Sequence, residues 1–224
     1  MSESPWLTVV TVVKDDVPGL EKTIRSLVEQ VNLSGVEYLV IDSSENSTAV
    51  ETAVKESLIA SALFSWCEPQ GIYAAMNTGL SLARGKYIYY LNAGDLLADP
   101  LVISDLKQSI EAVDPVWVVG RVEISEVSGK TVVSKSWDYH AEKKALFARG
   151  VFPPHQGTII RTESLQAAGG FSARYSISAD YAAALSLSLV SDPFMTDRVI
   201  ATFFEGGVST ERWQDSFREF HQAR

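Results

Sequence analysis

The feature that most constrains the fold is an apolar run that ends abruptly in one carboxylate. Residues 87–91, Tyr-Ile-Tyr-Tyr-Leu, are rich in strand-forming side chains, and the small residues Asn92, Ala93 and Gly94 separate them from Asp95. In open α/β sheets, ligands bind beyond the carboxyl ends of the strands, so an acid placed there can meet a cation or a substrate. A helix N-cap or an Asx turn is the alternative interpretation, and Asp95 taken alone favours it.

A second segment repeats this arrangement. Residues 37–42, Glu-Tyr-Leu-Val-Ile-Asp, form another apolar strand pattern that ends in Asp42. Upstream, residues 7–13 have the β-branched composition of a buried strand, and a turn at 14–19 leads into a helical pattern with one apolar face. The alternation predicts a Rossmann-like α/β fold with a mostly parallel central sheet flanked by helices, in which both acids lie at one edge.

Length and composition suit one domain of this kind. The chain has 224 residues and is 46% hydrophobic, which is enough to bury a substantial core, so we expect a single domain over 1–224. A formal net charge of −9 argues against binding of nucleic acid. The single Cys67 and the lack of a targeting pattern indicate a reducing cytoplasm. No apolar stretch approaches the ~20 residues of a membrane span, so we expect any membrane association to be peripheral.

The pattern changes near Asp114. Residues 116–120 predict a strand, and residues 122–136 predict a β-hairpin that turns at Ser128-Gly129-Lys130. Helical patterns then return in three segments, at 142–148, 162–168 and 180–190.

The order and spacing of eight short segments along the chain are informative. They are 8–14, 40–42, 68–77 (Glu-Pro-Gln-Gly-Ile-Tyr-Ala-Ala-Met-Asn), 83–88, 91–95 (Leu-Asn-Ala-Gly-Asp), 155–157, 169–171 and 179–181. Together they resemble the family 2 inverting glycosyltransferases of the GT-A fold, especially bacterial members that build cell-surface polysaccharide. The resemblance covers most of the chain. It implies a nucleotide-sugar-binding half at 1–114 and a C-terminal acceptor-side half at 115–224.

The resemblance implies roles for three acids. Asp42 would contact the nucleotide base, Asp95 would bind Mg²⁺ or Mn²⁺, and Asp180 would be the catalytic base on the acceptor hydroxyl. The chemistry fits, because a hard cation offsets diphosphate charge with few protein ligands, and inverting transfer requires a carboxylate on the acceptor side. Turn capping is the alternative for Asp42, and a first-turn acid favoured by the helix dipole is the alternative for Asp180.

The same resemblance implies further contacts with the nucleotide-sugar donor. These residues are Thr11, Val13, Glu68, Gly71, Tyr73, Asn77, Asn92, Ala93, His155 and Gln156. A structural hydrogen bond is the alternative for His155. Residues 205–209 contain paired glycines that suit a lid, and Trp137 and Tyr139 either stack on a sugar or lie in the core.

The chain departs from the family pattern at three positions. The usual Asp-X-Asp metal motif keeps only its last acid, with Gly94 before it, and Ala74 and Thr78 replace an Asp and a Lys. These changes indicate altered donor preference and weaker metal binding. We expect transfer of a sugar from a UDP- or GDP-sugar to a saccharide or lipid-linked acceptor in surface polysaccharide synthesis. A catalytically silent nucleotide-binding or scaffold subunit is the alternative, and a nucleotidyltransferase is less favoured because residues 14–19 hold only one glycine.

Overall fold

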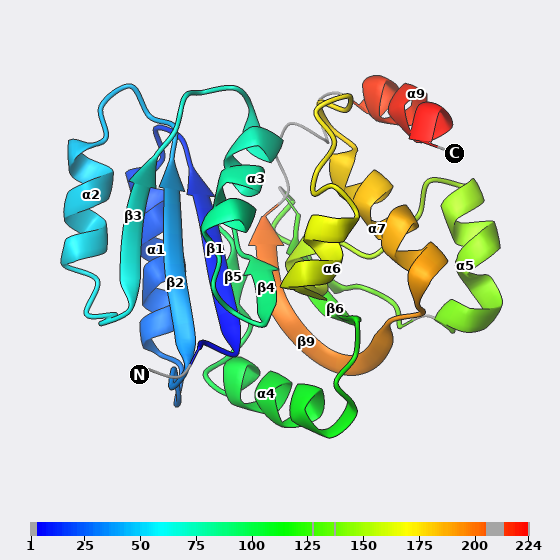
Figure 1. Cartoon of the computed structure of the whole chain (residues 1–224), viewed down its shortest axis with the longest axis horizontal. Coiled ribbons are helices and arrows are strands. Elements are labelled where there is room, and N and C mark those ends of the chain that lie inside the picture. The colour runs from blue at the N-terminus through cyan, green and yellow to red at the C-terminus, as the bar shows by residue number, and fades with distance from the viewer. Residues whose placement is uncertain (1–3, 127, 137, 205–212, 224) are drawn as a thin grey trace.

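The computed structural model describes residues 4–126, 128–136, 138–204 and 213–223, and these form one mixed sheet with helices on both faces (Figure 1). The strand order is β3-β2-β1-β4-β8-β6-β9-β5, and β7 pairs with β6. The strands are β1 Leu7–Val13, β2 Val36–Asp42, β3 Ala62–Trp66, β4 Tyr87–Tyr90, β5 Leu96–Leu97, β6 Trp117–Ser125, β7 Thr131–Val133, β8 Thr158–Arg161 and β9 Phe194–Phe204. The helices are α1 Val17–Val28, α2 Thr48–Lys55, α3 Ile72–Leu82, α4 Val102–Val113, α5 Tyr139–Ala148, α6 Thr162–Ala167, α7 Ala179–Val190 and α9 Trp213–Ala223.

The N-terminal half of the sheet is parallel. β3, β2, β1 and β4 run side by side in one direction, and every residue of β1 and β2 is buried, as expected for strands covered on both faces. Val13 at the end of β1 pairs with Asp42. After β4 the chain continues along β1, because the amides of Leu91 and Ala93 donate to β1 carbonyls. The carboxyl ends of these strands therefore place Asp42 and the 92–95 turn on the same edge.

The second half of the sheet is mixed. β8 lies antiparallel between β4 and β6, and β9 runs parallel to β6. The expected strand at 116–120 and the first hairpin arm are one continuous strand, β6, whose pairing with β9 is irregular between Val119 and Val122. Gly120 lies at this irregularity, and a Cβ there would be 2.3 Å from the Ile200 side chain. The hairpin with β7 forms, and residue 127 lies outside the described residues.

Two apolar clusters lie on opposite faces of the sheet. One packs under α1, α2 and α4, and the other packs under α3, α5, α6 and α7. Tyr139 belongs to the second cluster, where its ring meets Trp117 edge-on at a centroid distance of 5.5 Å. The suggestion that Tyr139 stacks on a sugar is therefore wrong, because the side chain is buried in the core. Trp137 lies outside the described residues.

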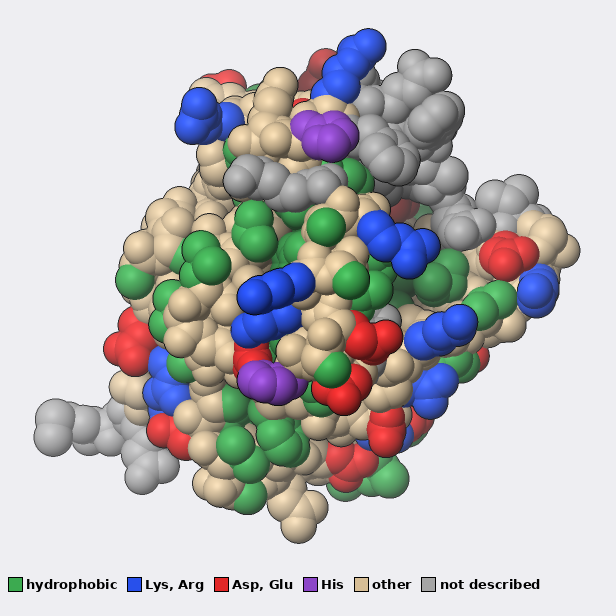
Figure 2. Space-filling view, turned by 90° about the vertical axis from the view of Figure 1, so that its right-hand side faces the viewer, with side chains coloured by type: hydrophobic (Ala, Val, Ile, Leu, Met, Phe, Trp, Pro, Cys, Tyr) green, Lys and Arg blue, Asp and Glu red, His purple; other side chains and the backbone are tan. Residues whose placement is uncertain are grey.

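The helices differ slightly from the sequence expectation. α5 begins at Tyr139 rather than 142, because the Asp138 side chain caps it by accepting the Ala141 N–H. Within the described part of the chain, none of the helices has the length and apolarity required to cross a bilayer. On the face that carries α5 and α9, positively and negatively charged side chains of the described residues are interspersed (Figure 2).

Candidate functional site

Asp42 ends β2 and is fully buried. Its Oδ1 atom accepts hydrogen bonds from the backbone N–H of Ser44 at 2.9 Å and from the Ser44 hydroxyl at 2.6 Å. Its Oδ2 atom is buried without a hydrogen-bond partner among the described residues. One oxygen thus holds the turn after β2, and the other is a hydrogen-bond acceptor that the described groups of the protein leave unused.

The two donor-site candidates on β1 are both buried. The Thr11 hydroxyl donates to the Leu91 carbonyl at 2.7 Å and accepts from the Tyr38 hydroxyl at 3.1 Å. This hydroxyl is therefore used within the sheet. Val13 lies beside Asp42 at the end of the strand, so it borders the same edge through its backbone.

Asp95 lies in a tight turn held against α1. The Thr23 hydroxyl accepts the Gly94 N–H at 3.0 Å and lies 2.8 Å from the Asp95 carbonyl oxygen, to which it donates. Gly94 has a φ of 93°, a conformation that favours glycine. Asp95 is only 9% exposed, and this burial raises its pKa to about 6, although the charge of His155 and a hydrogen bond from Gln156 oppose the shift. A nearby cation would favour the ionised form of such a carboxylate.

Asn92 and Asp95 are the groups of this turn that fit a divalent cation. The Oδ1 atom of Asn92 is buried without a partner in the described structure, and amide oxygens suit hard cations. Across the described residues, no group of three or more His, Cys, Asp and Glu side chains is arranged to hold a metal ion. A cation here therefore needs ligands from elsewhere, and Mg²⁺ commonly combines one or two carboxylates with substrate phosphates.

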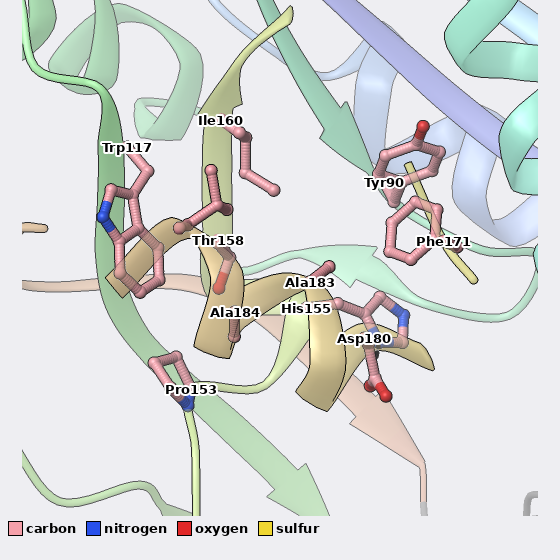
Figure 3. Close-up of a pocket in the computed structure, with 11 residues that line it drawn as sticks. Tyr90, Trp117, Pro153, His155, Thr158, Ile160, Phe171, Asp180, Ala183 and Ala184 are labelled. Atoms are coloured by element: carbon pink, nitrogen blue, oxygen red, sulfur yellow. Dashed lines mark ion pairs between the residues drawn. The ribbon is translucent and has the colours of Figure 1, made fainter. Parts of the chain in front are cut away.

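His155 connects this turn to the start of α7. Its Nε2 atom lies 3.1 Å from Nδ2 of Asn92, and its Nδ1 atom lies 3.5 Å from Oδ2 of Asp180 (Figure 3). The other Asp180 oxygen accepts the Tyr73 hydroxyl and the Tyr181 N–H, each at 2.9 Å. Burial and the neighbouring Asp180 charge raise the pKa of Tyr73, so its phenol remains a neutral donor.

Two hollows adjoin these residues. A cavity of about 20 Å³, room for about one water molecule, is lined by apolar side chains of β4, β8 and α7 together with His155 and Asp180 (Figure 3). A larger open groove of about 290 Å³ lies between the start of α1 and the end of β9, where Asp95 and Lys22 contribute to its wall.

Three further candidates, Glu68, Gly71 and Asn77, lie on α3 or in the segment just before it. Glu68 and Gly71 are exposed, and Gly71 has a φ of 102° with open space around it. Asn77 uses both ends of its amide on Phe171, since Nδ2 donates to the Phe171 carbonyl at 2.7 Å and Oδ1 accepts the Phe171 N–H at 2.9 Å. A Cβ on Gly170 would lie 2.5 Å from that Oδ1 atom, so this turn requires glycine. Asn77 therefore fixes the turn before α7.

The structure brings six of the thirteen candidates together. Asn92, Asp95, His155, Gln156, Tyr73 and Asp180 form one connected group. Asp42 lies on the same sheet edge, two strands from β4, a separation of roughly 10 Å. The sequence reasoning missed Ser44 and Phe171 as partners. Ser44 carries a detectable signal, because a serine two residues after an Asp is typical of an Asx turn. The proposed lid at 205–209 lies outside the described residues.

These features define an α/β domain that presents acids and a histidine beyond the carboxyl ends of its parallel strands, the usual ligand-binding edge of such sheets. A model of the family described as glycosyl transferase family 2 matches residues 8–168. The chain therefore belongs to glycosyl transferase family 2, and it is a glycosyltransferase.

The relatives and similar structures agree with this family. Two uncharacterized glycosyltransferases of Mycobacterium tuberculosis, MT1564 of strain CDC 1551 and Rv1514c of strain H37Rv, are 26% identical to this chain in an alignment 237 positions long. The alignment covers 95% of this chain and 80% of each relative. The crystal structure of S. aureus TarS 1–349 has a TM-score of 0.75 at 15% identity and covers 97% of this chain. Mannosyltransferase PcManGT from Pyrobaculum calidifontis, in complex with GDP-Man and Mn²⁺, has a TM-score of 0.70 at 17% identity and covers 99%.

This chain covers only part of each of the two solved structures. This chain spans 64% of TarS 1–349 and 65% of the mannosyltransferase. At such low identity the likeness shows the fold alone. The expected GT-A-type α/β fold is confirmed.

Proposed function

We propose that the chain moves a sugar, with inversion, from a UDP- or GDP-sugar to a saccharide or lipid-linked acceptor in surface polysaccharide synthesis. The observation that carries this proposal is the connection from Asp180 through His155 and Asn92 to the turn that holds Asp95. It places a base candidate and a cation candidate in one site, and transfer from a nucleoside diphosphate uses both, because the acceptor loses a proton and the leaving diphosphate carries negative charge. One TarS structure contains UDP-GlcNAc and the mannosyltransferase structure contains GDP-Man, which supports a donor of this class.

On the donor side, we assign binding to residues 1–114. The unpartnered Oδ2 atom of Asp42 accepts a hydrogen bond from an N–H of the nucleotide base. Asp95 and Asn92 hold a divalent cation, which when bound offsets the negative charge of the departing diphosphate. The Mn²⁺ in the mannosyltransferase structure supports the use of a cation in this family. His155 and Gln156 border the sugar, since both contact the group around Asp95.

On the acceptor side, Asp180 acts as the base. The acceptor oxygen forms a bond to C1 of the sugar as the bond from C1 to the diphosphate breaks, and Asp180 takes the hydroxyl proton. Oδ1 of Asp180 is already bonded to Tyr73 and the Tyr181 amide, so Oδ2 is the oxygen that takes the proton. We place this reaction in the cytoplasm, with a lipid-linked acceptor reached by peripheral contact at the inner face of the membrane.

The test uses purified full-length protein with Mn²⁺ and a panel of UDP-, GDP- and dTDP-sugars. Donor hydrolysis and transfer to saccharide acceptors are measured, together with calorimetric binding of UDP and GDP. We expect turnover with one donor and binding of its nucleotide. Silence with every donor, combined with no nucleotide binding, rejects the proposal. Nucleotide binding without turnover, and full function of Asp95→Ala and Asp180→Ala variants in a cellular polysaccharide assay, would favour the silent scaffold instead.

A further inference from the structure

The carboxylate of Glu219 in α9 holds the turn that leads into α7. Its Oε1 atom accepts the N–H of Ser176 at 2.8 Å and the Ser176 hydroxyl at 2.9 Å. Its Oε2 atom accepts the N–H of Ile177 at 3.0 Å and that of Ser178 at 2.8 Å. Successive backbone N–H groups that converge on one anion form a nest, and hydrogen bonds to an ionised acceptor are among the stronger ones. Burial opposes ionisation of Glu219, but these hydrogen bonds outweigh it and lower the pKa.

The same turn is held from its other side by Tyr73. The Tyr73 hydroxyl lies 2.5 Å from the carbonyl oxygen of Ile177 and 2.9 Å from Oδ1 of Asp180. Glu219 is near enough that its charge contributes to the raised pKa of this phenol. The single phenolic proton is shared between these two acceptors. The segment just before Asp180 is thus fixed by a carboxylate on its N–H side and by a phenol on its carbonyl side.

The N-cap residue of α7 does not cap the helix with its side chain. Its N-cap residue, Ser178, makes no side-chain capping bond, and the Ser178 hydroxyl is buried without a partner among the described residues. A serine at this position ordinarily caps the helix and stabilises it by about 1 kcal/mol. Here the turn is held by a residue 41 positions away in the sequence.

α9 is itself anchored next to Glu219. The Phe220 ring lies 4.7 Å from the Tyr181 ring and 5.9 Å from the Phe152 ring, measured between centroids. Gly150 permits this packing, because a Cβ there would lie 2.6 Å from the Phe220 ring. Figure 1 shows α9 lying beside the N-terminal start of α7. α9 therefore contacts α7 beside Asp180 and the loop that leads to His155.

We infer that Glu219 is a positioning residue for sugar transfer, whose carboxylate fixes the 176–178 turn so that Oδ2 of Asp180 stays directed towards His155 and the acceptor. The inference rests on the proposed function, in which Asp180 is the base. Glu219 touches no reacting atom, so its removal should affect turnover and leave donor binding intact.

The test compares Glu219→Ala and Glu219→Gln with a charge-matched control, Glu29→Gln. Glu29 is exposed and follows α1 at the opposite edge of the sheet. We expect kcat for transfer to fall about 10- to 100-fold in Glu219→Ala, because small displacements of catalytic groups have effects of this size. The donor KM and the affinity for UDP or GDP with Mn²⁺ should stay within about twofold. Glu219→Gln should be intermediate, since its amide keeps one acceptor oxygen, and Glu29→Gln should match the wild type.

Chemical rescue adds a second readout. Formate can occupy the vacated nest in Glu219→Ala and should restore kcat in a concentration-dependent way, whereas neutral formamide should not. Wild-type kcat in Glu219→Ala, or a fall in kcat accompanied by an equal loss of nucleotide affinity, overturns the inference. If Glu219→Ala does not fold, the same criteria are applied to Glu219→Gln: wild-type kcat, or equal losses of kcat and nucleotide affinity, overturn the inference.

A third readout does not depend on turnover. Hydrogen exchange at the amides of 176–178 should be faster in Glu219→Gln than in the wild type and in Glu29→Gln, and unchanged exchange overturns the inference. The proposed function fails by a different result, namely full transfer by Asp180→Asn. The two outcomes are therefore distinguishable.

Discussion

Nδ1 of His155 lies 3.5 Å from Oδ2 of Asp180, and at this contact the loop before β8 meets the first turn of α7. The side chains of both residues are mostly buried, at 21% and 16% exposure. Because Tyr73 and the Tyr181 amide already bond the other Asp180 oxygen, the oxygen facing His155 is the one that can receive a proton. The contact with His155 therefore identifies Oδ2 as the oxygen with which Asp180, the proposed base, would receive the proton.

Asp180→Asn should remove the base while keeping its shape. We expect kcat for transfer to fall about 10²- to 10⁴-fold, the usual contribution of general base catalysis, with nucleotide affinity unchanged. Initial rates and calorimetry with UDP or GDP measure the two effects. Asp197→Asn, an exposed acid on β9, is the control. A variant that keeps more than about a tenth of wild-type kcat contradicts the role of Asp180.

Asp95 should make stability depend on pH in the absence of metal. Its folded-state pKa is raised to about 6 from 3.8, so it contributes stability below about pH 3.8 that is lost as the pH rises through about 6. The shift corresponds to about 3 kcal/mol. Asp95→Asn does not titrate, and part of the wild-type contribution is already lost at pH 4. The free energy of unfolding of the variant relative to that of the wild type should therefore be about 2 kcal/mol higher at pH 8 than at pH 4. Urea denaturation in EDTA measures this difference, and parallel pH profiles would contradict it.

Asp42→Asn should weaken nucleotide binding with little effect on the fold. The amide can keep Oδ1, and with it both hydrogen bonds from Ser44, while the unpartnered acceptor becomes a donor. We expect the Kd for the bound nucleotide to rise about tenfold or more, as for the loss of a hydrogen bond to a charged group. Ser44→Ala is the matched variant. It should lower stability by about 1 kcal/mol and change the Kd less, and the reverse ranking would show that Asp42 only caps its turn.

Asn77→Ala should lower the stability of the fold rather than remove a contact with the nucleotide-sugar donor. It would leave the N–H and the carbonyl of Phe171 without their partners, which should lower the free energy of unfolding by about 1–3 kcal/mol. The neighbouring Thr78→Ala loses only a bond within α3 and should change stability by less than about 0.5 kcal/mol. Chemical denaturation measures both. A large loss of nucleotide affinity with unchanged stability would instead make Asn77 a donor contact.

The parallel half of the fold could be read from the sequence because its signals are local. β1 and β2 are mostly apolar, fully buried strands that end at Val13 and Asp42, and strand direction alone then places Asp42 and Asp95 on one edge. The strand order of the mixed half could not be predicted from local signals. β8 is inserted between β4 and β6, and this pairing joins segments far apart in the chain.

The candidate site, too, could be predicted from the sequence only in part. The resemblance named His155 and Asp180, but their contact depends on how the loop at 153–155 packs against α7. Asn77 stood among the expected donor contacts, whereas its amide is bonded at both ends to Phe171. Glu219 has no local signal at all, because its partners lie about 40 residues away.

The reduced metal motif offers a final prediction, because a carboxylate can be restored at either of two positions. Gly94 has a φ of 93°, so Gly94→Asp should lower stability by about 1–2 kcal/mol. Asn92 already directs a buried, unpartnered oxygen within the turn, so Asn92→Asp adds a charged ligand without moving the backbone.

We expect Asn92→Asp to raise the affinity for Mn²⁺ about tenfold in the presence of UDP or GDP, because cation affinity follows the charge of the ligand set. Calorimetric titration of Mn²⁺ measures it. Asn32→Asp, exposed beyond the C-terminal end of α1, adds the same charge away from the site and should leave the affinity unchanged. Equal affinities in Asn92→Asp and the wild type would mean that a cation, if bound, is not held at this turn.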